Sequence, residues 1–299
     1  MANTVTTAIG SKFLPILDEV YQAEAKSRIL DMDRQDIDFV GVDEVKIRKI
    51  DMDGLGNVDR NGDLEKGAVT VTTQTHKLEI DRGTIFSVDP MDNEETQAVA
   101  FGRLGGEFLR TKVIPEIDAI RFSKLASFGG TTIEADLTDT TVRTAIDDAI
   151  LKMDDDEVSE EGRAIFVSNE VVNLLEKLDA LDKFVNFGET SGNIGRRVLS
   201  YKGIPLIKIP RARFYTKIEL KDKADGFGYA KDATGKDLNF ILVHVQAVKG
   251  GVIKYNPMGI ISADANQTAF QDIMKFRIYH DCFILDNKKK GVYVHHKTT

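Results

Sequence analysis

Residues 44–75 read EVKIRKIDMDGLGNVDRNGDLEKGAVTVTTQT, a stretch that indicates either a metal-binding loop or a long β-hairpin. Apolar and charged residues alternate over residues 44–50, and β-branched residues are concentrated over residues 68–75. Both patterns are typical of β-strands. Between them lies a cluster of Gly, Asn and Asp, in which Asn61-Gly62 suits a tight turn. The sequence therefore predicts a long β-hairpin.

The same cluster has the composition of a calcium-binding loop, because hard cations take oxygen ligands. The candidate ligands in the best EF-hand frame are Asn57, Asp59, Asn61 and Asp63. Position 12 of this frame is Ala68, so the closing carboxylate is missing, and EF-hand loops are flanked by helices rather than strands. We therefore expect no metal site. A calcium-binding module at residues 51–63 is the alternative from a different functional class.

Composition limits the function classes. The chain has 299 residues, 42% of them hydrophobic and 29% charged, which is the balance of a globular protein with a large core. A formal charge of -8 argues against a wide basic face that grips nucleic acid. Cys282 is the only cysteine, so no intramolecular disulfide forms. The start lacks a secretory signal and residues 239–248 are too short to span a bilayer, so we expect a soluble intracellular protein without a cofactor.

A long helix is predicted to follow the hairpin, over residues 92–127. Asp92 followed by Glu95 resembles a capping box at its start. Apolar residues recur at spacings of three and four and form one stripe. The stripe contains Phe101, Leu104, Phe108, Val113, Ile117 and Ile120. Pro115 lacks a backbone N–H and is expected to kink the helix.

Helices and strands alternate in the middle of the chain. The predicted elements are helices at 142–153 and 170–181 and strands at 163–168, 202–210 and 240–248. Ser168 or Asn169 is expected to cap the second helix. Residues 211–238 are charged and contain glycine, which predicts a hairpin or long loop, and the chain beyond residue 252 is again rich in strand patterns. The predicted fold class is α+β.

No set of residues carries the chemistry of a catalytic site. His280, Asp281 and Cys282 are adjacent, but successive side chains of a strand point to opposite faces, so Asp281 points away from the other two. No glycine-rich elbow precedes Cys282, and a single buried cysteine is usually a packing residue. We therefore expect no enzymatic activity.

Two segments near the N-terminus need apolar partners that their own sequences do not supply. An isolated two-stranded ribbon is marginal in water, and residues 11–30 carry apolar side chains at the very start of the chain. A neighbouring subunit is a natural surface for both. The predicted inter-subunit contacts are Phe13, Leu17, Tyr21, Val45, Ile47, Asn61, Gly62, Val69 and Val71.

The order of these elements, with the phrases VIPEIDAIRFSKLA, AIFVSNEVVNLLEKL and YKGIPLIKIP, extends over nearly the whole chain. It resembles the major capsid proteins of tailed bacteriophages with the Hong Kong 97-like fold. The resemblance implies a division into an N-terminal arm, an extended loop with the hairpin, a peripheral domain with a spine helix, an axial domain, and a return to the peripheral sheet. The implied ranges are 1–40, 41–88, 89–130, 131–250 and 251–299.

The same resemblance implies a function. The chain would self-assemble as pentamers and hexamers into an icosahedral head that encloses double-stranded DNA without sequence-specific binding. Assembly in the host cytoplasm and a final location in the virion would follow, with procapsid maturation and with separate scaffolding and portal proteins as partners. No loop lysine matches a cross-linking motif, so covalent cross-linking is not predicted. The alternative within the same fold is an encapsulin, a nanocompartment shell that stores an enzyme.

Overall fold

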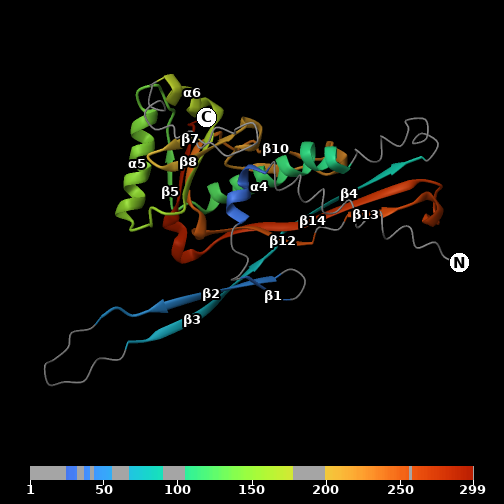
Figure 1. The fold of residues 1–299 in the computed structure, drawn as a ribbon, viewed down its shortest axis with the longest axis horizontal. Helices are drawn as coiled ribbons and strands as arrows, with labels where there is room; N and C mark the ends of the chain where they lie inside the picture. The colour runs from blue at the N-terminus through green and yellow to red at the C-terminus, as the bar shows by residue number, and fades with distance from the viewer. Residues whose placement is uncertain are drawn as a thin grey trace, which may run out of the picture.

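The computed structural model describes residues 25–31, 37–40, 44–55, 67–89, 105–177, 199–255 and 258–298. These residues form an α/β body, a long antiparallel sheet that runs out from it, and a hairpin that projects away from both (Figure 1). The chain is therefore α+β, and its two largest sheets, of six and four strands, are built from segments far apart in the sequence.

The predicted hairpin is confirmed. It is formed by β2 (Glu44–Met52) and β3 (Val69–Lys77), with the short strand β1 (Ile37–Val40) on the other edge of β2. The antiparallel register runs from Glu44↔Lys77 to Met52↔Val69, and the Asp53 N–H extends it by donating to the Ala68 carbonyl at 3.1 Å. The residues that flank the acidic cluster are therefore strands, whereas an EF-hand requires helices.

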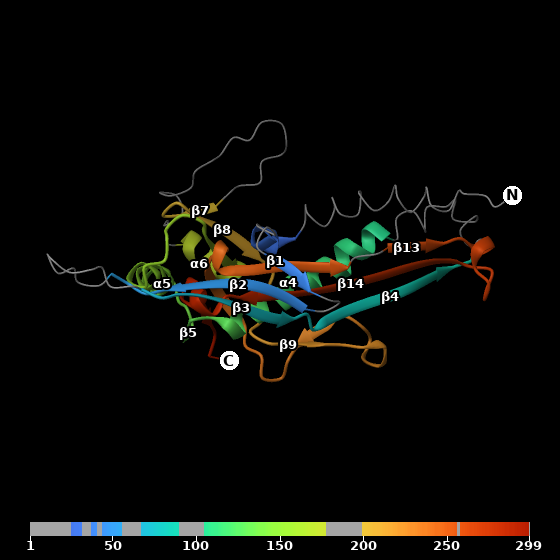
Figure 2. The same ribbon diagram turned by 90° about the horizontal axis from the view of Figure 1, so that it is seen from below.

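The long sheet is organised around one strand. β14 (Asp272–Ile284) pairs antiparallel with β4 on one side and with β12 and β13 on the other. The bounds of these partners are β4 (Ile80–Val88), β12 (Val248–Tyr255) and β13 (Met258–Ile261). Viewed from below, β4 and β14 run side by side along the sheet (Figure 2). The helix after β4 covers one face, where Leu109, Val113 and Ile117 pack on Met274, Phe276 and Ile278.

That helix is interrupted near its proline. Residues 105–108 are helical, a π-helical turn, η2, spans Leu109–Val113, and α4 spans Ile114–Phe128. The Ile114 N–H donates to the Leu109 carbonyl, five residues back, and Pro115 lies in the first turn of α4. A proline has no N–H to give and its ring crowds the preceding turn, so a widened turn accommodates it. Residues 92–104 of the predicted helix lie outside the described residues.

The body contains a six-stranded sheet with the order β5-β15-β11-β6-β8-β7. The strands are β5 (Thr131–Glu134), β6 (Arg163–Ser168), β7 (Leu199–Tyr201), β8 (Ile204–Ile209), β11 (Leu238–His244) and β15 (Val292–His296). α5 (Val142–Asp155) and α6 (Asn169–Lys177) pack on one face, and α4 packs on the other through Phe122 and Leu125. The predicted cap of α6 is confirmed, because the Val171 N–H donates to Ser168 Oγ at 3.3 Å.

Two expectations for the C-terminal half need correction. Residues 240–248 are not one strand: β11 ends at His244, and a 3₁₀ turn, η5 (Val245–Ala247), passes the chain to β12 in the other sheet. β15 also lies in the six-stranded sheet, parallel to β5 and antiparallel to β11, so residues 251–299 do not all return to the long sheet. Pairing between segments this far apart is set by the tertiary fold and leaves no local sequence pattern.

The segment 211–238 contains the predicted hairpin. β9 (Ile218–Leu220) pairs antiparallel with β10 (Tyr229–Lys231). This segment also contains the short 3₁₀ turns η3 (Arg211–Arg213) and η4 (Lys223–Asp225). Other 3₁₀ turns are η1 (Lys26–Asp31), η6 (Ala263–Ala265) and η7 (Asp286–Gly291). Arg82 of β4 joins this hairpin to the long sheet by donating to the carbonyls of Lys221 and Gly228 at 2.9 and 3.1 Å.

Candidate assembly surfaces

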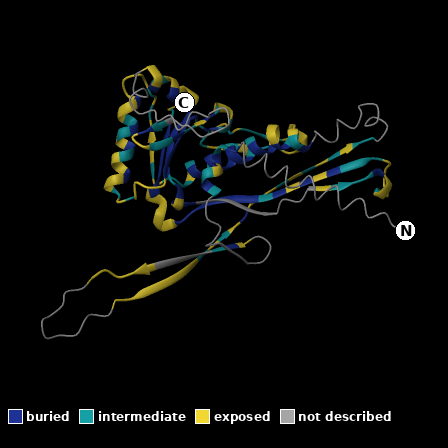
Figure 3. Ribbon diagram, in the orientation of Figure 1, coloured by how far each residue is buried: buried dark blue, intermediate teal, exposed yellow. Residues whose placement is uncertain are grey.

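The hairpin exposes apolar side chains that no described part of the chain covers. Val69 and Val71, both predicted contacts, are 65% and 62% exposed, and Met52 and Leu55 are fully or largely exposed as well. Figure 3 shows the contrast between this exposed ribbon and the buried sheet of the body. β-Branched side chains favour strands, but here they face solvent, so the hairpin exposes an apolar surface.

The root of the hairpin is a different environment. Val45, predicted as an inter-subunit contact, is completely buried in its own chain against Leu78, Phe283 and Leu285. It therefore fastens the hairpin to the long sheet and is unavailable to a neighbour in this conformation. Alternation along a strand predicts which residues share a face, but it does not tell at which residue the ribbon leaves the body.

The remaining predicted residues are only partly described. Ile47 pairs with Gln74 through the backbone of the hairpin, but the structure does not describe its side chain. Outside the described residues altogether are the predicted contacts Phe13, Leu17, Tyr21, Asn61 and Gly62 and the metal candidates Asn57, Asp59, Asn61 and Asp63. In the described part of this loop, the Asp53 carboxylate accepts the Ala68 N–H at 2.7 Å and so closes the ribbon.

Polar contacts also hold the hairpin root. His76 of β3 stacks on Phe283 with ring centroids 4.7 Å apart, and Gln74 Nε2 donates to the Asp286 carboxylate. Burial lowers the pKa of His76, although Asp286 and Asp281 act in the opposite direction. The imidazole is therefore neutral at pH 7 and acts as a flat packing surface.

The N-terminal segment is anchored on α4 by a buried charged network that the sequence patterns did not predict. Asp118 is fully buried and accepts the N–H groups of Lys26 and Ser27, each at 3.1 Å, and the Ser27 hydroxyl at 2.7 Å. Arg213 donates to Oδ2 of the same carboxylate at 3.1 Å, the oxygen that also accepts the Lys26 N–H. Four donors therefore satisfy one buried carboxylate.

A buried arginine completes this anchor. Arg121, also fully buried, donates to Ser27 Oγ at 2.8 Å and pairs with Asp31 at 2.9 Å. Leu30 of η1 is buried in the core between the two sheets. The sequence carried one signal of this site: Asp118 and Arg121 fall three residues apart on the otherwise apolar face of the helix, where they can contact a common partner.

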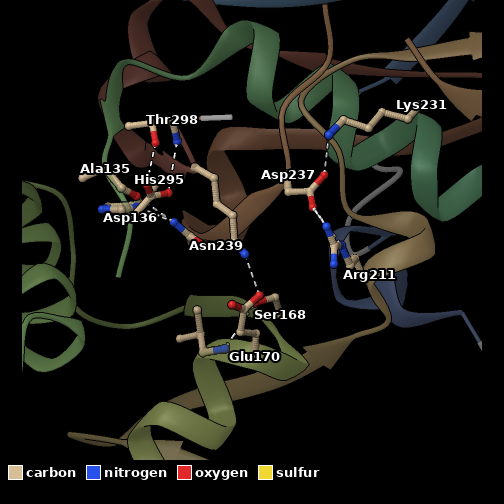
Figure 4. Close-up of polar contacts among 12 residues, drawn as sticks. Ala135, Asp136, Ser168, Glu170, Arg211, Lys231, Asp237, Asn239, His295 and Thr298 are labelled. Atoms are coloured by element: carbon tan, nitrogen blue, oxygen red, sulfur yellow. Dashed lines mark hydrogen bonds and ion pairs between the residues drawn. The ribbon is translucent and has the colours of Figure 1, made fainter. Parts of the chain in front are cut away.

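The last strand of the body is held by polar contacts from several elements (Figure 4). Asn239 Nδ2 donates to the Ala135 carbonyl at 3.0 Å and lies 3.1 Å from His295 Nδ1, while the Thr298 N–H donates to Asp136 at 3.3 Å. Burial lowers the pKa of His295 to about 4. These contacts fasten the chain end into the sheet.

A second group in the same view surrounds Asp237 (Figure 4). Arg211 and Lys231 donate to its two carboxylate oxygens at 2.8 and 2.7 Å. Burial alone would raise the pKa of Asp237, but the hydrogen bonds from Lys231 and Arg211 lower it. Asp237 is therefore an ionised structural residue that ties η3 to β10 and β11.

The adjacent residues His280, Asp281 and Cys282 are packed in the interior. Burial raises the pKa of the Cys282 thiol to about 12, so a thiolate is not formed near pH 7. Burial, together with Arg121, lowers the pKa of His280 to about 3. Asp281 accepts the N–H groups of Glu79 and Cys282 at 3.2 and 2.8 Å. This arrangement supports packing rather than nucleophilic catalysis.

Two further kinds of site are absent from the described ranges. No three His, Cys, Asp or Glu side chains there are grouped closely enough to hold a metal ion. In those ranges no helix combines the length and the apolar character that crossing a membrane requires.

Comparison with known proteins gives one consistent result. No family model and no curated protein matches the chain. Among solved structures, the fold is similar to a chain from Mycobacterium phage Ogopogo (12% identity, TM-score 0.56, covering 91% of each chain). It is also similar to the capsid of the cyanophage P-SCSP1u (14% identity, TM-score 0.56, 87% of this chain and 85% of that one).

A third example is the head structure of Helicobacter pylori bacteriophage KHP40, with 13% identity, a TM-score of 0.54 and coverage of 84% and 83%. The chain therefore has the fold of phage capsid (head) proteins. Since identities this low establish fold alone, the function of this particular chain depends on its own surfaces.

Proposed function

We propose that this chain is a structural subunit of a phage head, a major capsid protein of the Hong Kong 97-like type. It self-assembles as pentamers and hexamers into an icosahedral shell that encloses double-stranded DNA without reading its sequence. The observation that carries the proposal is a capsid fold whose longest hairpin leaves Val69, Val71, Met52 and Leu55 exposed.

The energetics favour assembly over a solitary subunit. A two-stranded ribbon without a covered face is marginally stable in water. Fully burying one Val, Leu or Met side chain contributes about 1.5–3 kcal/mol. Several such side chains on each hairpin, repeated around a closed lattice, make each weak contact part of a multivalent assembly. Adjacent copies therefore supply the apolar surface that the ribbon lacks.

The other parts of the chain take corresponding roles under this proposal. Residues 1–40 act as an arm that η1 fastens to α4 through Asp118, and residues 41–88 act as the extended loop. The peripheral region comprises 89–130 with most of 251–299, and the axial region comprises 131–250 with β15 added. The subunit has no enzymatic activity and works with separate scaffolding and portal proteins, first in the host cytoplasm and then in the virion.

The test is negative-stain electron microscopy of the purified full-length chain, combined with sedimentation. We expect capsomer rings or closed shells, and native particles that contain nuclease-protected DNA. A discrete monomer at all concentrations would rule out the shell role. Closed shells that contain a protein cargo in place of DNA would support an encapsulin.

A further inference from the structure

A cleft of about 990 Å³ opens between β4, the helical segment before and within α4, and the β9–β10 hairpin. This volume lies within the range of pockets that bind small molecules. Aromatic side chains such as Phe86, Phe108 and Tyr215 line it. No element of the proposed function uses this cleft, and three features of its lining indicate a small-molecule site.

The first feature is an excess of positive charge. Six basic side chains line the cleft, against the two acidic ones of Glu116 and Asp222. Three of the six are paired with carboxylates, whereas Lys112, Lys221 and Lys223 pair with no acidic side chain of the described residues. They come from two walls, because Lys112 belongs to η2 and the other two follow β9. A chain with a net charge of -8 therefore gathers uncompensated cations here.

The second feature is an aromatic side chain held at the rim in an unfavourable backbone conformation. Phe227 has a φ of 60° and lies between Gly226 and Gly228, whose φ values are 92° and 80°. Bulky residues rarely adopt positive φ, because the side chain crowds the backbone. The residue is nevertheless 56% exposed in the lining of the cleft, so burial does not offset this strain. An exposed flat ring beside cationic side chains is a stacking surface for a second aromatic ring.

The third feature is a buried polar atom without a partner. His280 is 1% exposed and lines the cleft, and its Nδ1 has no hydrogen-bond partner among the described residues. Buried polar atoms are normally satisfied, because leaving one without a partner costs free energy. Since its pKa is lowered to about 3, the imidazole is neutral near pH 7, and Nδ1 donates or accepts according to the tautomer. The cleft thus offers aromatic walls, three unpaired ammonium groups and an open hydrogen-bonding position.

We propose that this cleft binds a nucleoside phosphate, with the base against the aromatic walls and the phosphate beside Lys221 and Lys223. The base supplies a flat ring for Phe227 and a polar edge for His280, and the phosphate supplies the anion that the unpaired lysines lack. A lysine binds phosphate as a compact point charge on a flexible stem, so ammonium groups from two walls suit this ligand.

Other classes of ligand account for fewer of these features. A fatty-acid-like anion fits the lysines and the apolar walls, but its chain has no ring for Phe227 and no polar group for the buried His280. An inorganic anion uses the lysines alone, and a neutral aromatic compound leaves them unused. Nucleoside phosphate chemistry occurs both in a free nucleotide and in the unpaired end of a nucleic acid strand, so the test includes both sources.

Isothermal titration of the full-length, dissociated chain tests the ligand class. The probes are ATP, adenosine, inorganic triphosphate, oleate and a short single-stranded oligothymidine. We expect ATP to bind at micromolar concentration, and adenosine and triphosphate each to bind roughly tenfold more weakly, because each makes only part of the contacts. Oligothymidine that binds more tightly than ATP would identify a strand end as the source, and weaker binding would identify a free nucleotide.

Variants locate the site. Lys221→Gln with Lys223→Gln should weaken ATP binding roughly tenfold. Lys275→Gln with Lys288→Gln, on exposed lysines outside the cleft lining, is the matched control and should have little effect. Phe227→Gly should weaken binding by a similar factor without lowering the thermal unfolding temperature, because glycine tolerates positive φ. A purely structural role of Phe227 would instead lower that temperature and leave ATP binding unchanged.

Nuclear magnetic resonance tests the position of the base without altering a buried residue. The chain has five histidines, so selective ¹⁵N labelling of histidine gives a simple spectrum. Saturation with ATP should shift the Nδ1 resonance of His280 and leave those of His244 and His295, which do not line the cleft, in place. An unmoved His280 resonance, or equal shifts at all three histidines, would place the ligand elsewhere and overturn the proposal.

The remaining outcomes are equally decisive. The proposal is overturned if ATP does not bind, or if the two pairs of lysine variants weaken its binding equally. Triphosphate that binds as tightly as ATP would mean an anion site only, and oleate that binds more tightly would mean an amphiphile site. None of these results bears on the shell role, which is tested separately by electron microscopy of the wild-type chain.

Discussion

The β2–β3 hairpin and the β6–β11 pair are both regular antiparallel ladders, yet their surroundings are opposite. Every residue of β6 is buried, whereas most of β3 is exposed (Figure 3). Both pairs have the same kind of backbone hydrogen-bond ladder. The ladder therefore does not explain why the two pairs differ in how they are stabilised. The body is stabilised by its own core, whereas the apolar side chains of the hairpin find no such cover in the described part of the chain.

This comparison predicts the size of mutational effects on subunit unfolding. The largest effect is expected at Phe166 in β6, which is fully buried and packs edge-on against Phe122 with centroids 5.0 Å apart. Phe166→Ala should lower the unfolding free energy of the dissociated subunit by about 3–5 kcal/mol, because it leaves a cavity. Urea unfolding followed by circular dichroism measures it. A loss below about 1 kcal/mol would mean that the body is not the source of stability.

The buried anchor of the arm comes next. Asp118→Ala removes the buried acceptor of Arg213 and of the Lys26 and Ser27 N–H groups, so we expect a loss of about 3 kcal/mol. Protease sensitivity near residues 26–31 should rise at the same time, because η1 loses the acceptor of its N–H groups. Ser123→Ala, on the same helix but outside the network, is the control. Equal stability of the two variants would contradict the anchor.

The pH dependence of stability should differ between the body, which contains His295, and the hairpin root, which contains His76. His295 has a pKa lowered to about 4 by burial, so its contribution to stability is complete above pH 6.5 and declines as the pH falls toward 4. Between pH 6.5 and 5 the imidazole of His295 gains a proton in the unfolded state but not in the folded state. The unfolding free energy should therefore fall by about 2 kcal/mol over this range. His295→Gln should flatten the slope in that window, as measured by urea unfolding at several pH values. His76→Gln, in the more exposed hairpin root, should flatten it less.

The hairpin itself should contribute little to the subunit and much to assembly. Val69→Ser with Val71→Ser should change the unfolding free energy by less than about 0.5 kcal/mol, since both side chains already face solvent. Shell formation, followed by light scattering, should be strongly reduced. Unchanged assembly would remove the hairpin from the shell contacts, and a large loss of subunit stability would mean that the ribbon folds back onto its own body.

The smallest expected effect is that of calcium. The EF-hand frame lacks its closing carboxylate, and its flanks are the strands β2 and β3. Isothermal titration with calcium chloride should give no binding heat, and chelators should leave the thermal unfolding temperature unchanged. Micromolar binding that Asp59→Ala abolishes would revive the calcium-binding alternative at residues 51–63.

Local elements followed from the sequence, because their signals are short-range. The alternation over 44–50 gave β2, and residues 163–168 match β6 in both bounds. Of the two residues expected to cap α6, Ser168 and Asn169, Ser168 accepts the Val171 N–H. The cleft between β4, α4 and the β9–β10 hairpin was not predicted, since its walls come from three distant segments.

The sequence by itself determined the β2–β3 hairpin, the strand β6 and the cap of α6, since these depend on neighbours within about ten residues. Only the tertiary structure decided that β15 enters the body sheet, that Val45 is buried while Val69 is exposed, and that Asp118 holds the N-terminal segment. Such outcomes depend on which surfaces from distant parts of the sequence pack together. The stabilisation from burying apolar area is gained only when both surfaces leave water, so no local pattern contains it.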